Sequence, residues 1–148
     1  MTEIPKDKDN SVYSYMDWKT ITNKNSAQYK LRIKYNTYDS NGLADIKGRK
    51  VVACTSTFGS IGDEIEVTFK NGVDYFNKQS KTLFAIIGDF KNQNDPNCDK
   101  YGHLYGNTQR SVIEFIVDSS KITNIKSKFP GLKNNPVIKI ERTGVNFL

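Results

Sequence analysis

The stretch LFAIIGD, residues 83–89, decides the fold that we expect for this chain. An apolar run leads into Gly88 and then into the carboxylate of Asp89. A short apolar run that ends at a turn residue is typical of a strand buried on both faces. Glycine at that point lets the backbone turn or lets another group approach closely. We therefore expect a buried strand that presents Asp89 at the margin of a hydrophobic core.

The carboxylate of Asp89 has two interpretations. At the margin of a core, burial and neighbouring charges shift the pKa of a carboxyl group, and catalytic acids depend on such shifts. Alternatively, the side chain accepts a backbone hydrogen bond and opens a turn. Our working hypothesis is that Asp89 is a catalytic acid.

Composition describes a polar chain that fits one domain. It has 148 residues, of which 36% are hydrophobic, and a mean hydropathy of -0.61. No apolar run approaches the roughly 20 residues that cross a bilayer, so we expect no membrane partner. The first ten residues, MTEIPKDKDN, lack the apolar segment of a secretory signal peptide. We therefore expect synthesis in the cytoplasm, and another route of delivery if the protein acts outside a cell.

The net charge of +6 favours polyanionic partners. The lysines are spread along the chain, and acids rather than bases occupy the expected strand ends, so nucleic acid is the least favoured partner. Two cysteines, Cys54 and Cys98, permit one disulfide and no ordinary zinc site. We expect Cys54 in the core, Cys98 in a polar loop, both as thiols, and no metal or cofactor.

Further strands follow from periodicity. Residues 29–38 (YKLRIKYNTY) alternate apolar and charged side chains, which predicts a half-buried strand. Residues 64–70 alternate likewise, with Ile65, Val67 and Phe69 inward and the glutamates outward. Additional strands are expected at residues 50–54, 111–117 and 136–143, and weak helical spacing marks residues 119–129.

We therefore predict a mostly β protein. Residues 1–28 form an N-terminal arm, and residues 29–148 form a closed barrel of six strands with one short helix. Residues 12–21, within the arm, fit either a short strand or a turn of helix.

A second carboxylate, Glu114, interrupts the apolar strand at residues 111–117. An acid in such a place is paired, protonated or exposed to a cleft, because burying its charge is costly. Two acids in unequal surroundings are the usual equipment for cutting a glycosidic bond. The alternative is that Glu114 pairs with a lysine on a solvated face.

Four other residues are candidates for binding a substrate. Lys91 lies two positions beyond Asp89 and points to the same side if the strand continues, where it holds a substrate anion or tunes the aspartate. His103, the only histidine, orients Asp89 or contacts substrate. Trp18 and Tyr35 supply rings that stack on sugars. The alternatives are a surface lysine, an exposed loop histidine and two core aromatics.

The order of the motifs resembles a known family. Residues 50–54, the loop and strand FGSIGDEIEV at 58–67, AIIGD at 85–89, and SVIEF at 111–115 after Gly106 follow one another along the chain. This order resembles the double-psi β-barrel of the three-aspartate (3D) domain and of related lytic transglycosylases and expansins. The resemblance covers about residues 51–118.

The resemblance implies roles for both acids. Asp89 matches the aspartate that the family uses as its catalytic acid, and Glu114 falls where the family has the aspartate of its final strand. The family's first aspartate has no match, because Cys54, Thr55 and Ser56 occupy that region. Residues 15–29 also look like an arm found in such domains of phages and prophages of Gram-positive, low-GC bacteria.

Two functions are consistent with this resemblance. It implies a peptidoglycan-cleaving, lytic transglycosylase-like domain of a phage or phage-like tail, with glycan strands as substrate. In that setting the chain belongs to a virion, its tail hub or baseplate, with other tail or baseplate proteins as partners. The alternative is a non-catalytic structural or glycan-binding tail module, which the missing first aspartate favours.

Overall fold

The computed structural model describes residues 2–3, 15–71, 80–91, 96, 98–102, 112–123, 125 and 135–148. These residues are mostly β, as predicted. The strands are β1 (Thr2–Glu3), β2 (Tyr15–Asp17), β3 (Asp45–Ile46), β4 (Arg49–Cys54), β5 (Asp63–Phe69), β6 (Thr82–Phe90), β7 (Glu114–Val117) and β8 (Val137–Asn146). The helices are α1 (Ala27–Tyr35) and the 3-10 turns η1 (Trp18–Thr20), η2 (Ser56–Phe58) and η3 (Ser119–Lys121).

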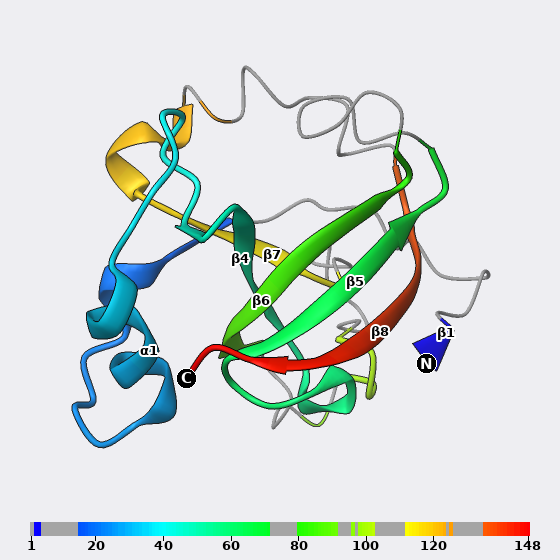
Figure 1. Ribbon diagram of the computed structural model, residues 1–148, viewed down its shortest axis with the longest axis horizontal. Coiled ribbons are helices and arrows are strands. Elements are labelled where there is room, and N and C mark those ends of the chain that lie inside the picture. Colours follow the sequence, from blue (N-terminus) through cyan, green and yellow to red (C-terminus); the bar gives the residue numbers. More distant parts are fainter. Residues whose placement is uncertain are drawn as a thin grey trace.

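All described strands belong to one mixed sheet. Its order is β1-β8-β5-β6-β4-β7-β2, and β3 pairs with β4 off this path. The β4–β6 and β2–β7 pairs are parallel, and the others are antiparallel. The long strands β5, β6 and β8 curve together, while α1 lies to one side of them near the C-terminus (Figure 1). The eight described strands exceed the predicted six, because β1, β2 and β3, of two or three residues each, show no periodicity, while one predicted strand, at residues 29–38, is absent.

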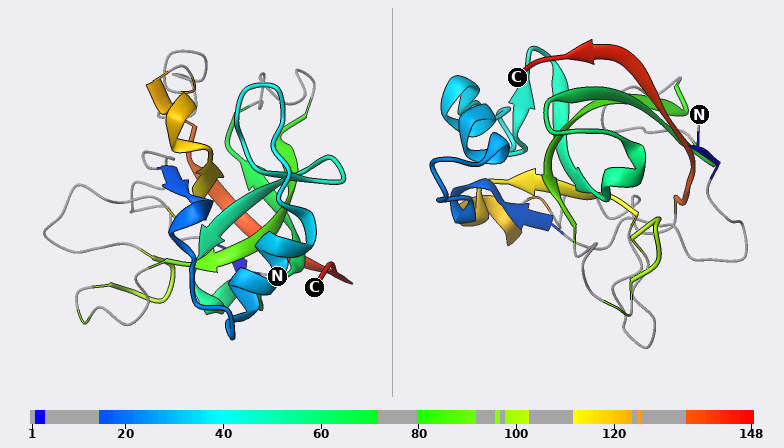
Figure 2. Two further views of the ribbon diagram at one scale, coloured as in Figure 1. Left: turned by 90° about the vertical axis from the view of Figure 1, so that its left-hand side faces the viewer. Right: turned by 90° about the horizontal axis from the view of Figure 1, so that it is seen from below.

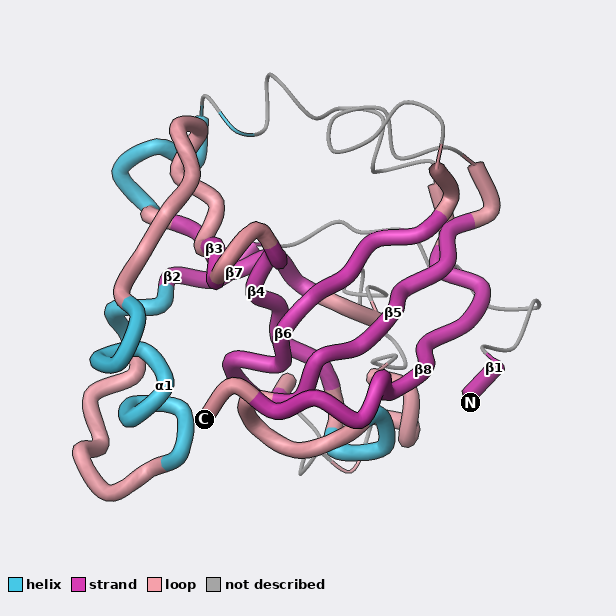
Figure 3. Tube along the Cα trace, in the orientation of Figure 1, coloured by secondary structure: helices cyan, strands magenta, loops and turns pink. Residues whose placement is uncertain are grey.

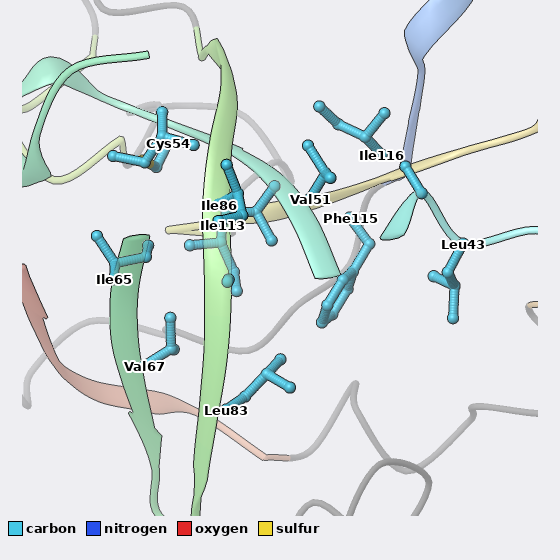
Figure 4. Packing of buried hydrophobic residues seen from close by; sticks show 14 of the residues in the cluster. Leu43, Val51, Cys54, Ile65, Val67, Leu83, Ile86, Ile113, Phe115 and Ile116 are labelled. Atoms are coloured by element: carbon cyan, nitrogen blue, oxygen red, sulfur yellow. The ribbon is translucent and has the colours of Figure 1, made fainter. Parts of the chain in front are cut away.

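The core lies between the central strands. Figure 4 shows side chains from β4, β5, β6 and β7 gathered in one cluster. Val51, Ile65, Ile86 and Phe115 are each 0% exposed. The inward residues predicted for 64–70 are confirmed, because β5 buries alternate apolar side chains against this cluster. The apolar stretch at 83–89 is confirmed as part of β6.

The strand predicted at residues 29–38 is wrong, because most of this segment is the helix α1 (Figure 3). Ser26 caps the helix, since its hydroxyl accepts a hydrogen bond from the Tyr29 backbone N–H at 3.1 Å. Such an N-cap satisfies a donor that the first turn leaves unpaired. Ala27 and Leu31 are four residues apart and share a helical face, and Leu31 is fully buried whereas Ile33 is 54% exposed. Helical spacing therefore prevails over the alternation that predicted a strand.

The outward position predicted for Glu64 is also wrong. Glu64 is 6% exposed. Its carboxylate accepts from Arg49 Nε at 2.6 Å and from Thr143 Oγ1 at 2.7 Å. Burial raises the pKa of Glu64, but these hydrogen bonds and the positive charge outweigh burial and hold the pKa below its ordinary value. The paired carboxylate is thus tolerated inside the sheet.

The structure also tests the predictions for the N-terminal arm, for residues 119–129 and for the two cysteines. Residues 12–21 contain both alternatives, since β2 leads into η1. The expected arm at 1–28 reaches into α1, and its β2 pairs in parallel with β7 of the same sheet. Figure 2 shows β2 beside β7 and α1 close to the C-terminus. Of residues 119–129, the described ones form η3 and the start of a helix. No disulfide joins Cys54 and Cys98, and Cys54 is buried as expected.

Candidate active site

Ala53 on β4 brings the two predicted acids to the same row of the sheet. On one side Ala53 is in register with Asp89 of β6, and on the other side with Glu114 of β7. Residues in register on neighbouring strands project from the same face. Two strand spacings separate the backbones of Asp89 and Glu114 by about 10 Å. We call Asp89 and Glu114 the acid pair.

A small apolar residue, Ala53, lies between these acids in the sheet. Ala53 is 0% exposed, yet it does not belong to the hydrophobic cluster that includes its strand neighbours Val52 and Cys54. The acids therefore flank a small apolar residue and are shielded from water without being placed in the main core. Both acids remain partly exposed.

A β-bulge at Gly88 directs Asp89 to this row. Val52 pairs with Ile87, whereas the next residue, Ala53, pairs with Asp89, so Gly88 is the extra residue on β6. In a regular ladder without the bulge, Gly88 would lie opposite Ala53 and Asp89 opposite Cys54, whose side chain packs in the core. Bulges re-aim side chains in this way, and they are frequent beside active sites.

Position 88 has room only for glycine. A Cβ built there would lie 2.3 Å from Val51 Cγ1 and 3.0 Å from Ile116 Cδ1. Real Cβ atoms essentially never come closer than 3.0 Å to such neighbours. The glycine is therefore required by close packing of β6 against β4 and β7, and this packing holds the bulge in place.

Asp89 is held through one of its two oxygens. Oδ1 accepts from the Phe90 backbone N–H at 2.8 Å and from Gln28 Nε2 of α1 at 3.3 Å. Burial raises the pKa of Asp89, and these two donors oppose the shift without cancelling it. Asp89 therefore keeps its proton to a higher pH than an exposed aspartate does, as a general acid requires.

Glu114 has a different electrostatic environment. Burial raises the pKa of its carboxyl group, the Lys91 ammonium lowers it, and the Asp89 carboxylate raises it again. The net shift is upward. The register on either side of Ala53 places the acid pair near enough for Asp89 to act on Glu114, and the nearby cation distinguishes Glu114 from Asp89.

Lys91 lies in the same site and is buried rather than exposed. Its side chain is 3% exposed, and Nζ donates to the Gly102 carbonyl at 2.7 Å. Burial lowers the pKa of Lys91, against the opposing effect of Glu114, Cys98 and Asp99. The surface-lysine interpretation is therefore wrong, and the charge of Lys91 acts on Glu114 through a poorly solvated space.

Residues 98–102 form one wall of this space. Thr55 Oγ1 and Thr57 Oγ1 donate to the Lys100 carbonyl at 2.5 and 2.6 Å. The Lys91 backbone N–H donates to the Cys54 carbonyl at 2.9 Å. The threonine bonds attach residues 98–102 to the segment that follows β4, and the bond to Cys54 holds the backbone of Lys91 at the end of β4.

The two predicted aromatic residues make contacts within the protein. Trp18 is 0% exposed, and its ring packs edge-on against Tyr38 with centroids 6.3 Å apart. Stacking on a sugar does not fit that burial, so the core interpretation applies to Trp18. Tyr35 donates from its hydroxyl to the Phe147 carbonyl at 2.8 Å. It is seven residues from Gln28, or about 10 Å along the helix.

The predicted site residue His103 lies outside the described residues.

The sequence interpretation missed two residues of the site, Gln28 and Ala53. Gln28 was missed because a lone glutamine carries no chemical signal and its segment was expected to end an arm. Ala53 was missed because alanine in an apolar run resembles any core residue. The cap formed by Ser26 was a local signal for the helix that carries Gln28.

Comparison with known proteins gives no assignment, because no protein-family model, curated protein or solved structure matches the chain. Within the described ranges, no group of three or more His, Cys, Asp or Glu side chains is arranged to hold a metal ion. No helix in that part of the chain has both the length and the apolar character needed to cross a membrane. The described residues do contain two partly buried carboxyl groups beside a buried ammonium.

Proposed function

We propose that this chain is a glycan-cleaving domain that acts on peptidoglycan in the manner of lytic transglycosylases, on a double-psi β-barrel. We further propose that it belongs to a phage or phage-like tail. The observation that carries the chemistry is the acid pair, two partly buried carboxyl groups that flank Ala53 and have raised pKa values. The tail setting is supported by the motif order and by the resemblance of residues 15–29.

Asp89 is the proton donor in this proposal. Burial keeps its carboxyl group protonated to higher pH, and no cation is among the causes of its shift. It protonates the glycosidic oxygen between MurNAc and GlcNAc, the C1–O bond breaks, and positive charge develops on the MurNAc ring. The Asp89 carboxylate then takes the proton of the C6 hydroxyl, whose oxygen closes a 1,6-anhydro ring on C1.

Glu114 is the stabilising carboxylate. The Lys91 ammonium favours the ionised form of Glu114 and partly offsets the upward shift of its pKa, whereas no cation acts on Asp89 in this way. A carboxylate near the sugar lowers the energy of the oxocarbenium-like transition state by electrostatic attraction. The difference between the two environments divides acid and stabiliser between two otherwise similar groups.

The test is to incubate purified protein with peptidoglycan and to analyse the products by mass spectrometry. We expect anhydro-muropeptides from wild type and a loss of roughly 100-fold or more from Asp89→Asn, the scale of general acid catalysis. Glu114→Gln is expected to slow the reaction without changing the product. Glu141→Gln, on an exposed position of β8, is the matched control and retains activity.

Two results would overturn the enzymatic proposal. If wild type releases no product, or if Asp89→Asn releases as much as wild type, the acid pair does not catalyse glycan cleavage. Wall binding without turnover, unchanged in Asp89→Asn, would instead support a non-catalytic tail module. Products with a reducing MurNAc end would still support catalysis by the acid pair, but they would refute closure of the 1,6-anhydro ring.

The tail setting needs a separate measurement. Proteomic analysis of density-purified particles from a host that carries the gene is expected to find the chain in fractions that contain tail proteins. Its absence from such particles would refute the tail assignment and leave the glycan chemistry to be judged by the products.

A further inference from the structure

We infer that Gln28 is a positioning residue that places the transferable proton of Asp89 on Oδ2. This inference rests on the proposed function of Asp89 as the acid. It assigns a role in the site to helix α1, which lies outside residues 51–118, the segment that resembles the family's barrel.

The geometry distinguishes the two oxygens of Asp89. Both donors, the Phe90 backbone N–H and Gln28 Nε2, are directed at Oδ1. A proton on Oδ1 would face these N–H groups and displace at least one of them. In the described part of the chain no donor is directed at Oδ2. The proton therefore resides on Oδ2, and Oδ2 is the atom that delivers it to the glycosidic oxygen.

Gln28 is held in place from both ends of its helix. At the start, the Ser26 cap orders the first turn, in which Gln28 lies. In the middle, Leu31 is 0% exposed and anchors α1 against the protein. At the end, Tyr35 bonds to the Phe147 carbonyl. The helix backbone that carries the Gln28 amide is therefore fixed by its cap and its packing.

A neutral amide suits an acid that must later act as a base. Once Asp89 has given up its proton, the donors from Phe90 and Gln28 stabilise the carboxylate on Oδ1. Besides the acid pair itself, the site contains the charged ammonium of Lys91, which follows β6. Gln28 therefore lowers the energy of ionised Asp89 without adding a charge to the site.

The experiment measures the pKa of Asp89 directly, by NMR titration of its carboxyl carbon in wild type and Gln28→Ala. We expect the pKa to rise in the variant, because a donor to the ionised form is lost. The alkaline limb of the pH–rate profile is expected to move to higher pH with it, and kcat to fall by roughly three- to tenfold, the scale of one typical hydrogen bond. Gln28→Asn, one methylene shorter, should behave like Gln28→Ala.

Lys30→Ala is the matched control, because Lys30 is an exposed position of α1 and its loss leaves Gln28 unchanged. The inference fails if the pKa of Asp89 is the same in Gln28→Ala and wild type, or if Lys30→Ala shifts it equally. The titration does not depend on turnover, so it tests the hydrogen bond even if the protein releases no glycan product. Conversely, an unshifted pKa alongside an inactive Asp89→Asn would overturn only the role of Gln28.

Discussion

Replacing Gly88 by alanine should damage both the stability and the acid pair. The new methyl would lie 2.3 Å from Val51 Cγ1 and 3.0 Å from Ile116 Cδ1. Val51 and Ile116 are each 0% exposed, so neither side chain can move into solvent. Adding a methyl group to a packed core costs about 1–3 kcal/mol. For a chain of this length that corresponds to a fall in Tm of about 2–4 °C per kcal/mol, or roughly 3–10 °C.

A double-mutant cycle connects this loss to one contact. Val51→Ala removes Cγ1 and by itself costs about 1.6 kcal/mol or more for two buried methyl groups. Because it also removes the closest clash, we expect Gly88→Ala with Val51→Ala to be less destabilised than the sum of the single variants. A coupling of about 1 kcal/mol is expected, within the range for residues in contact. Urea unfolding followed by circular dichroism provides the four free energies.

Gly48→Ala is the control for the cycle. Gly48 has a φ of +87° but no atom within 4 Å of its Cβ position, so only backbone strain of roughly 1–2 kcal/mol is expected. That strain should add to the effect of Val51→Ala without coupling. Gly88→Ala with an unchanged Tm, or strict additivity with Val51→Ala, would refute close packing as the reason for glycine at the bulge.

Two further predictions concern pH and stability. The pKa of Asp89 is raised by burial, so its ionised form opposes folding above the unfolded-state pKa of about 3.9. Asp89→Asn should therefore have a higher Tm than wild type at pH 7 and the same Tm as wild type below about pH 3. An equal Tm at pH 7 would contradict this prediction. The pKa of Glu64 is lowered, so its pair with Arg49 stabilises the protein above about pH 4.3 and loses that effect as the pH falls through the folded-state pKa. Arg49→Met should lose roughly 1–3 kcal/mol in urea unfolding at pH 7 and less below pH 4, whereas a pH-independent loss would assign the effect to packing alone.

Local patterns in the sequence were sufficient for the principal strands. The apolar run at residues 83–89 forms part of β6, and the alternation at 64–70 forms β5 with Ile65, Val67 and Phe69 buried. Both results depend on how consecutive side chains meet one core, which is a property of the segment itself. Residues 29–38 failed by the same criterion, because their apolar spacing fits both a strand and a helix. The Ser26 cap and burial of Leu31 decided for the helix.

The sequence by itself determined a mostly β chain and the identity of two acids set in apolar strands. Only the tertiary structure decided that Asp89 and Glu114 flank Ala53, that Gly88 is an extra residue, and that Gln28 contacts Asp89. Strand order and register join segments far apart in the chain, and a shift of one residue reverses which face a side chain occupies. In one register Asp89 would lie opposite Cys54 and face the core, and in the observed register it lies opposite Ala53. No local sequence pattern distinguishes these two registers.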